Sequence, residues 1–351
     1  MARGATLTGG RSARLATGAA AVVLTLVALE GATRVMDLGP PATAMNGYVS
    51  DPVLPFRCRP NVSGVDEIAD GVRIPYHHNS LGFRDDEHAF AKPAGTLRVV
   101  GLGDSFTYGT GAPMEASYLE QLERRLNRRP APHPPVEAIN LGLPRYFPSA
   151  EALLLQHYGL RFDPDVVIVG VTPNDVIDTF LGLDAVTVHE SGYLVPRATQ
   201  QLGPFATTLF LHSQLARMVV ARTLAPRGTG GEVPRPDDVF VAGGFHEWDW
   251  QALESDLHSI LGLARRHGAR VAVVGIPQSG LDGPGVQYFD SRLAVWSRSE
   301  NTLYISVLDA LRTGATVEPM YWRQDGHCRP AGYAVIAETI ADALIGAGMV
   351  P

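Results

Sequence analysis

The sequence predicts an α/β fold in which helices cover both faces of a parallel sheet. Two features of the 351-residue chain carry this prediction. Short apolar segments without polar alternation recur along the chain, as expected of strands that are buried on both faces. Segments with apolar residues at helical spacing separate them, and strands that alternate with helices indicate a parallel sheet. The chain is long enough to bury a sizeable core.

Five segments are predicted strands, because each is short and rich in Val, Ile or Leu. They are residues 97–104, 136–142, 165–172, 270–277 and 303–308. The predicted helices have apolar residues three or four positions apart on one face. They lie around residues 119–126, 149–161, 253–264 and 336–344.

The chain divides into three predicted parts. Residues 1–36 form a signal anchor or signal peptide, and residues 37–95 form an irregular lead-in, rich in Pro, Gly, Asp and Asn, that wraps over a domain. Residues 96–351 form that domain. Gly, Pro and polar clusters mark residues 176–245 as an insertion, which contains one apolar, helix-like stretch at 209–224.

The N-terminus has the order of a targeting signal. Arg3, Arg11 and Arg14 precede an uncharged apolar run at 15–29. We favour an uncleaved membrane anchor over a cleaved signal peptide, because the sequence Ala42-Thr43-Ala44 fits a cleavage site but lies far downstream of the run. With either outcome, we expect the rest of the chain to lie outside the cytoplasm, anchored to the membrane or secreted.

Composition excludes several classes of protein. A formal net charge of −7 supplies no global positive field, so nucleic acid is not an expected partner. No zinc-binding His-Glu-x-x-His motif occurs, so a bound metal is not expected. No cofactor is expected either. Cys58 and Cys328 are the only cysteines, which allows at most one disulfide. Pairing and two separate thiols both remain open, because spacing does not establish proximity.

Residues with catalytic chemistry stand at the carboxyl ends of the predicted strands, where ligands bind in a doubly wound sheet. Ser105 follows the first strand at a turn flanked by glycines, and Gly142 ends the second. Asn174 follows the third strand. Asp325 and His327 come just before the last helix. Each of these short motifs is common by itself, and their order and placement together point to a catalytic site.

Together these four blocks resemble the SGNH (GDSL-type) hydrolase superfamily, over about residues 76–348. The lead-in segment 79–85, with the sequence NSLGFRD, is similar to the segment that precedes the first block in many bacterial members. The resemblance implies a three-layer α/β/α sandwich with a flavodoxin-like parallel sheet of about five strands. One departure is Thr172, which stands where the third block usually has glycine.

The resemblance also implies the roles of the site residues. Ser105 matches the nucleophile, and Asp325 and His327 match the rest of the catalytic triad. Gly142 and Asn174 match donors of the oxyanion hole, to which the Ser105 N–H is added.

The chemistry of these residues agrees with that assignment. A serine hydroxyl needs a base to take its proton, and the neutral imidazole of His327 suits this task. A carboxylate two residues earlier, Asp325, can hold the imidazole in one tautomer. Asp104 and Asp175 are expected to turn or cap their loops rather than to react.

Three functions fit the sequence. The first is an extracytoplasmic serine esterase that cleaves an acyl ester, with acetyl as the expected acyl group, of a small molecule or glycan. The second is an O-acyltransferase that uses the same triad to acetylate a polysaccharide. The third is a non-catalytic glycan-binding protein, against which the apparently complete set of Ser105, Asp325, His327 and Asn174 argues.

Overall fold

A computed structural model describes residues 9–36, 47–68, 70–189, 192–197, 203–224 and 247–351. The chain forms two compact units. One unit consists of residues 1–44 and 195–232, and the other of residues 45–194 and 233–351. The lead-in from residue 45 onward therefore belongs to the same compact unit as the sheet.

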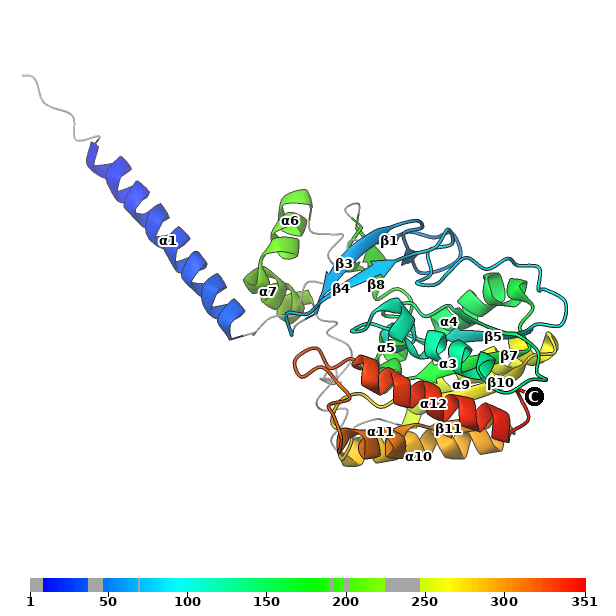
Figure 1. The fold of residues 1–351 in the computed structure, drawn as a ribbon. Coiled ribbons are helices and arrows are strands. Elements are labelled where there is room, and N and C mark those ends of the chain that lie inside the picture. Colours follow the sequence, from blue (N-terminus) through cyan, green and yellow to red (C-terminus); the bar gives the residue numbers. More distant parts are fainter. Residues whose placement is uncertain (1–8, 37–46, 69, 190–191, 198–202, 225–246) are drawn as a thin grey trace, which may run out of the picture. The chain divides into compact units, whose positions relative to one another are not determined.

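The larger unit is built on a five-stranded parallel sheet, as predicted. Its strand order is β11-β10-β7-β5-β6 (Figure 1). The strands are β5 (Leu97–Leu102), β6 (Val136–Asn140), β7 (Val166–Val171), β10 (Arg270–Gly275) and β11 (Leu303–Ser306). The chain passes from β5 to the edge strand β6 and then returns across β5 to β7. This reversal creates a switch point beside the end of β5, where ligands bind in such sheets.

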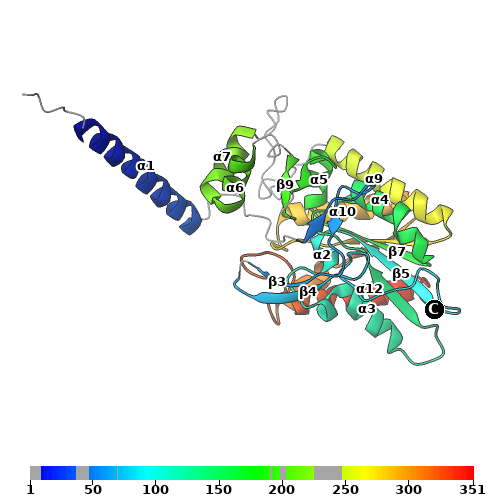
Figure 2. The ribbon, with the colours of Figure 1, turned by 90° about the horizontal axis from the view of Figure 1, so that it is seen from above.

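Helices cover both faces of the sheet, which gives the predicted three-layer α/β/α sandwich (Figure 2). Val99 and Ile168 point to one face and Val100 and Val169 to the other, because successive residues of a strand alternate. The first face packs against α3 (Tyr118–Asn127), α11 (Leu308–Ala315) and α12 (Pro330–Gly346). The second packs against α4 (Pro148–His157), α9 (Glu247–Arg266) and α10 (Pro284–Ser299).

Helix α3 illustrates how local sequence sets an element. Ser117 precedes it, and the Ser117 hydroxyl accepts a hydrogen bond from the backbone N–H of Glu120. Leu119, Leu122 and Leu126 recur at helical spacing and are fully buried against the sheet.

The lead-in contains short antiparallel strands that its composition did not predict. Strand β1 (Tyr48–Val49) pairs with β2 (Arg57–Cys58), and β3 (Ser63–Glu67) pairs with β4 (Arg73–His77). Short helices and strands complete the larger unit around the strand ends. They are α2 (Ser105–Tyr108), the 3-10 helices η1 (Met114–Ala116) and η2 (Gly159–Phe162), α5 (Asn174–Leu181) and β8 (Val186–Val188). Strand β9 (Leu194–Pro196) follows β8 along the chain.

The predicted helical stretch 209–224 is wrong as a single element. The structure has two helices there, α6 (Pro204–His212) and α7 (Gln214–Leu224), separated by Ser213. The Ser213 hydroxyl accepts a hydrogen bond from the backbone N–H of Ala216 at 3.0 Å, so it caps a new helix. A serine hydroxyl can replace a helix carbonyl as the acceptor of a backbone N–H, and this local bond explains why α6 ends and α7 begins at Ser213.

The N-terminal helix α1 (Gly9–Val35) belongs to the smaller unit. Residues 14–35 are long and apolar enough to cross a membrane, a property that signal sequences near an N-terminus share. Within this unit, the carboxylate of Glu30 accepts hydrogen bonds from the Ser213 hydroxyl and the Gln214 backbone N–H. The cleavage pattern at residues 42–44 lies outside the described residues.

The two cysteines are separate thiols in the structure. Cys58 and Cys328 are both fully buried, and burial raises the pKa of each thiol. Each therefore packs as a small apolar side chain.

We expect Leu122→Ala to lower the free energy of unfolding by about 2–5 kcal/mol, because it leaves a cavity between α3 and the sheet. Urea unfolding of the full chain measures this. The matched control is Val295→Ala on α10, whose side chain is 60% exposed; we expect a change within about 0.5 kcal/mol. Equal effects in both variants would contradict the packing described here.

Candidate active site

The structure brings Ser105, His327 and Asp325 together in one hydrogen-bonded chain. The Ser105 Oγ lies 2.8 Å from His327 Nε2. The His327 Nδ1 lies 2.6 Å from Asp325 Oδ1, the separation of a strong, charge-assisted hydrogen bond. Serine and histidine are 222 positions apart in the sequence, so the fold itself creates this arrangement.

Ser105 is presented by a tight turn between β5 and α2. The carboxylate of Asp104 caps α2 by accepting a hydrogen bond from the Phe106 backbone N–H at 2.8 Å. Gly103 has a φ of 153°, and a Cβ there would lie 2.0 Å from the Thr107 hydroxyl oxygen. Only glycine fits at this position of the turn. The Ser105 side chain that follows is partly exposed at the end of the sheet.

His327 is held by its own loop and by an aromatic neighbour. Its ring lies beside the Phe106 ring, with 4.9 Å between the centroids. Its carbonyl accepts a hydrogen bond from the Trp322 backbone N–H at 2.9 Å. The indole of Trp322 in turn donates to the carbonyl of Gly111, which links this loop to the segment after α2. These contacts fix the imidazole beside the serine.

Gly142 packs directly against α2. A Cβ at this position would lie 2.2 Å from the Tyr108 backbone nitrogen, so only glycine allows the approach. Its N–H donates to the side-chain carbonyl of Asn140 at 2.9 Å, and the Asn140 amide donates to the Thr107 carbonyl at 3.0 Å. The predicted oxyanion donor is therefore beside the nucleophile helix but bonded within the protein, so an oxyanion would compete with Asn140 for it.

Asn174 lies at the end of β7 within a network of polar side chains. Its amide nitrogen donates to Asp104 Oδ2 and to Asp178 Oδ2, each at 3.2 Å. Its carbonyl oxygen accepts from the Thr172 hydroxyl at 2.8 Å and from the side-chain amide of Gln278. Thr172, the departure noted in the sequence, thus adds a hydroxyl that contacts Asn174.

Asp104 and Asp175 have the capping and turning roles that the sequence predicts. Asp104 is buried at the N-terminus of α2, and burial raises the pKa of its carboxyl group. Asp175 is also buried, and its Oδ2 accepts a hydrogen bond from the Thr172 backbone N–H at 2.7 Å. Gln278 was missed by the sequence analysis, although its position just beyond the fourth predicted strand was the available signal.

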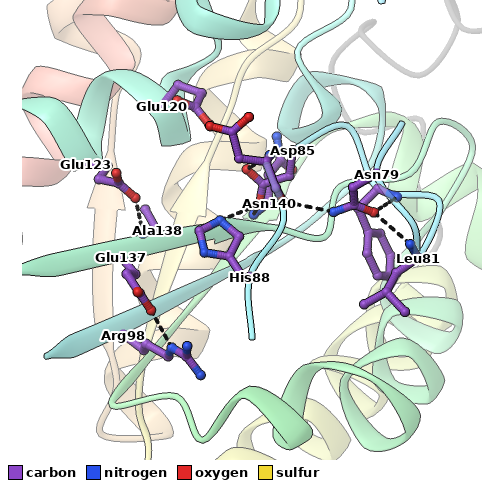
Figure 3. Close-up of polar contacts among 12 residues, drawn as sticks. Asn79, Leu81, Asp85, His88, Arg98, Glu120, Glu123, Glu137, Ala138 and Asn140 are labelled. Atoms are coloured by element: carbon purple, nitrogen blue, oxygen red, sulfur yellow. Dashed lines mark hydrogen bonds and ion pairs between the residues drawn. The ribbon is translucent and has the colours of Figure 1, made fainter. Parts of the chain in front are cut away.

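A cluster of carboxyl groups lies beside the edge strand β6 (Figure 3). Asp85, from the lead-in, accepts a hydrogen bond from the Asn140 backbone N–H at 2.8 Å. Glu120 lies beside it, and Glu123 accepts from the Ala138 backbone N–H at 2.7 Å. Burial and the neighbouring carboxylates raise the pKa of Glu120 to about 8. Within the described ranges, no three His, Cys, Asp or Glu side chains are arranged to hold a metal ion.

Residues 102–335, more than half of the chain, match the GDSL-like Lipase/Acylhydrolase family. The chain belongs to this family, which confirms the resemblance predicted from the four blocks. It is accordingly a serine hydrolase that acts on ester bonds.

Solved structures of lipolytic and esterase proteins are similar to the chain. A G-D-S-L family lipolytic protein from Desulfitobacterium hafniense shares 15% identity at a TM-score of 0.43, covering 71% of this chain and 99% of the other. A catalytic mutant of an acetylxylan esterase from Geobacillus stearothermophilus shares 11% identity at a TM-score of 0.42, covering 71% and 94%. No curated protein sequence matches the chain.

The raised pKa of Glu120 predicts a pH dependence of stability. Its folded pKa of about 8 exceeds the ordinary value of 4.5, so the unfolded chain releases this proton first as the pH rises. The Glu120 contribution to the free energy of unfolding therefore falls between these two values and is constant above them. Because Glu120→Gln cannot ionise, its stability relative to the native chain should rise with pH across this window.

Urea unfolding at about pH 5 and about pH 9 measures the difference between the two proteins. Glu115→Gln is the control, because Glu115 is exposed just before the same helix. A Glu120→Gln difference that stays constant with pH would show that Glu120 ionises normally.

Proposed function

We propose that this protein is an extracytoplasmic esterase that hydrolyses an acyl ester, with acetyl as the acyl group, through an acyl-enzyme on Ser105. The observation that carries the proposal is the continuous hydrogen-bonded chain from Ser105 through His327 to Asp325, with separations of 2.8 and 2.6 Å. This geometry suits proton transfer from a serine hydroxyl to an imidazole.

In the first half of the reaction, His327 Nε2 takes the Ser105 hydroxyl proton as Oγ attacks the ester carbonyl. The bond between the carbonyl carbon and the alcohol oxygen then breaks, and the imidazolium gives its proton to the departing alcohol. In the second half, water attacks the acyl group with His327 again as base, which releases the acid and restores Ser105. Asp325 stabilises the imidazolium that forms in each half.

The negative oxygen of each tetrahedral intermediate needs hydrogen-bond donors. The Ser105 N–H lies in the first turn of α2, where helix N–H groups lack intrahelical acceptors. Gly142 N–H and the Asn174 amide complete the proposed set. Both are bonded within the protein, to Asn140 and to carboxylates respectively. We expect these bonds to shift when the oxyanion forms, because a developing full charge is the stronger acceptor.

The proposed location rests on the N-terminal segment. The apolar part of α1, residues 14–35, begins at a basic residue, and Arg3 and Arg11 precede it. Positive charge favours the cytoplasmic side of a membrane, which would leave the catalytic unit on the other side. The substrate would then be an acyl ester of a small molecule or glycan outside the cytoplasm.

Hydrolysis of p-nitrophenyl acetate by the full chain in detergent tests the proposal. We expect Ser105→Ala and His327→Ala each to lower kcat by at least about a thousandfold, because serine and base act as a unit. Asp325→Asn should lose about a hundredfold to ten-thousandfold, since the imidazole is then held less well.

Ser279→Ala is the matched control, because Ser279 is an exposed serine near Gly326 of the catalytic loop. It should retain the native rate. Esters of longer acids assayed alongside test the acetyl preference. Hydrolysis that persists in Ser105→Ala would reject the acyl-enzyme mechanism, and faster cleavage of a long-chain ester would reject acetyl as the preferred group.

A further inference from the structure

The lead-in places three polar side chains against three different catalytic segments. We propose that Asp70, Arg84 and Asp85, here called the brace, are positioning residues that hold the segments of Ser105, Gly142 and Asp325 in register. The inference deepens the proposed esterase function and rests on it. The sequence predicts only that the lead-in covers the domain. The brace would give the lead-in a second role, in positioning the catalytic segments.

Arg84 holds the segment that carries the nucleophile. Its side chain is 2% exposed, and its two terminal nitrogens donate to the carbonyls of Gly109 and Ala112, each at 2.7 Å. Gly109 ends α2, which has only the four residues Ser105–Tyr108. A helix of one turn is not stable alone, and a cation near its C-terminus binds the unpaired carbonyls there. Arg84 therefore fixes the end of α2 opposite the Asp104 cap.

Asp85 holds the end of β6. Its side chain is buried, and it accepts the Asn140 backbone N–H at 2.8 Å (Figure 3). The Asn140 side chain then bridges the Gly142 N–H and the carbonyl of Thr107 in α2. Asp85 thus sets the position of the residue that links Gly142 to the nucleophile helix.

Asp70 holds the loop that carries the catalytic acid. It lies in the connection between β3 and β4, and its Oδ2 accepts the backbone N–H groups of Gln324 and Asp325, each at 3.0 Å. Hydrogen bonds to a carboxylate are stronger than those between neutral groups. Asp325 must lie 2.6 Å from His327, so displacement of its backbone would misplace the imidazole.

The contacts of Arg84, Asp85 and Asp70 each hold a segment that carries a catalytic residue. Catalytic groups need placement within about 0.5 Å, and a misplacement of about 1 Å can cost a hundredfold in rate. Arg84 and Asp85 are buried, so their loss would also disturb folding. Asp70 is only half-buried and lies on a hairpin turn. A substitution there can therefore test the positioning role without disturbing the fold.

The test compares Asp70→Ala and Asp70→Asn in the full chain with p-nitrophenyl acetate. We expect Asp70→Ala to lower kcat about tenfold to a hundredfold while KM changes less than about twofold, because Asp70 acts through the backbone of Gln324 and Asp325. Asp70→Asn should retain most of the rate, since its carbonyl can accept both N–H groups. Glu67→Ala, which removes an exposed carboxylate from the same hairpin, should behave as the native chain.

Amide hydrogen exchange of a peptide covering residues 322–327 supplies a readout independent of activity. Exchange should be faster in Asp70→Ala than in the native chain, and unchanged in Glu67→Ala. Native kcat and native exchange in Asp70→Ala would overturn the inference, as would an Asn variant as slow as the Ala variant. If the native chain hydrolyses no faster than Ser105→Ala, the proposed function fails, and exchange alone then decides whether Asp70 holds the loop.

Discussion

The site depends on the hydrogen bonds of the Asp104 carboxylate, because they join the segments that follow β5 and β7. One oxygen caps the helix that begins with Ser105, and the other accepts from the side-chain amide of Asn174, just beyond the end of β7. The group is 1% exposed, and burial of a carboxylate is costly unless several donors satisfy it. Its donors lie on both sides of the switch point, so they fix the nucleophile turn relative to Asn174.

This polar arrangement stands on a largely apolar core. The strand residues buried on the two faces of the sheet are mostly Val, Ile and Leu. Behind the site, however, Glu151 is fully buried and neither of its carboxyl oxygens has a hydrogen-bond partner within the described structure. Burial raises its pKa well above the ordinary value, because an unpartnered charge is costly there.

The sequence was sufficient for the sheet and for the order of the site residues, because buried strands and strand-end motifs are local signals. Helix α10 was missed, although Val286, Phe289, Leu293 and Trp296 recur at helical spacing. The contacts of Asp70 could not be predicted, because they join positions 254 and 255 residues apart and no local pattern encodes them. Long-range polar contacts of this kind appear only when the chain has folded.

The separation of Ser105 and His327 along the chain also bears on synthesis. The nucleophile turn emerges early, but its base lies in the last tenth of the sequence. A growing chain therefore carries an ordinary, unreactive serine until residue 327 has been made. A product truncated before residue 327 would thus bear the serine motif without its reactivity, because the base that activates the serine would be missing.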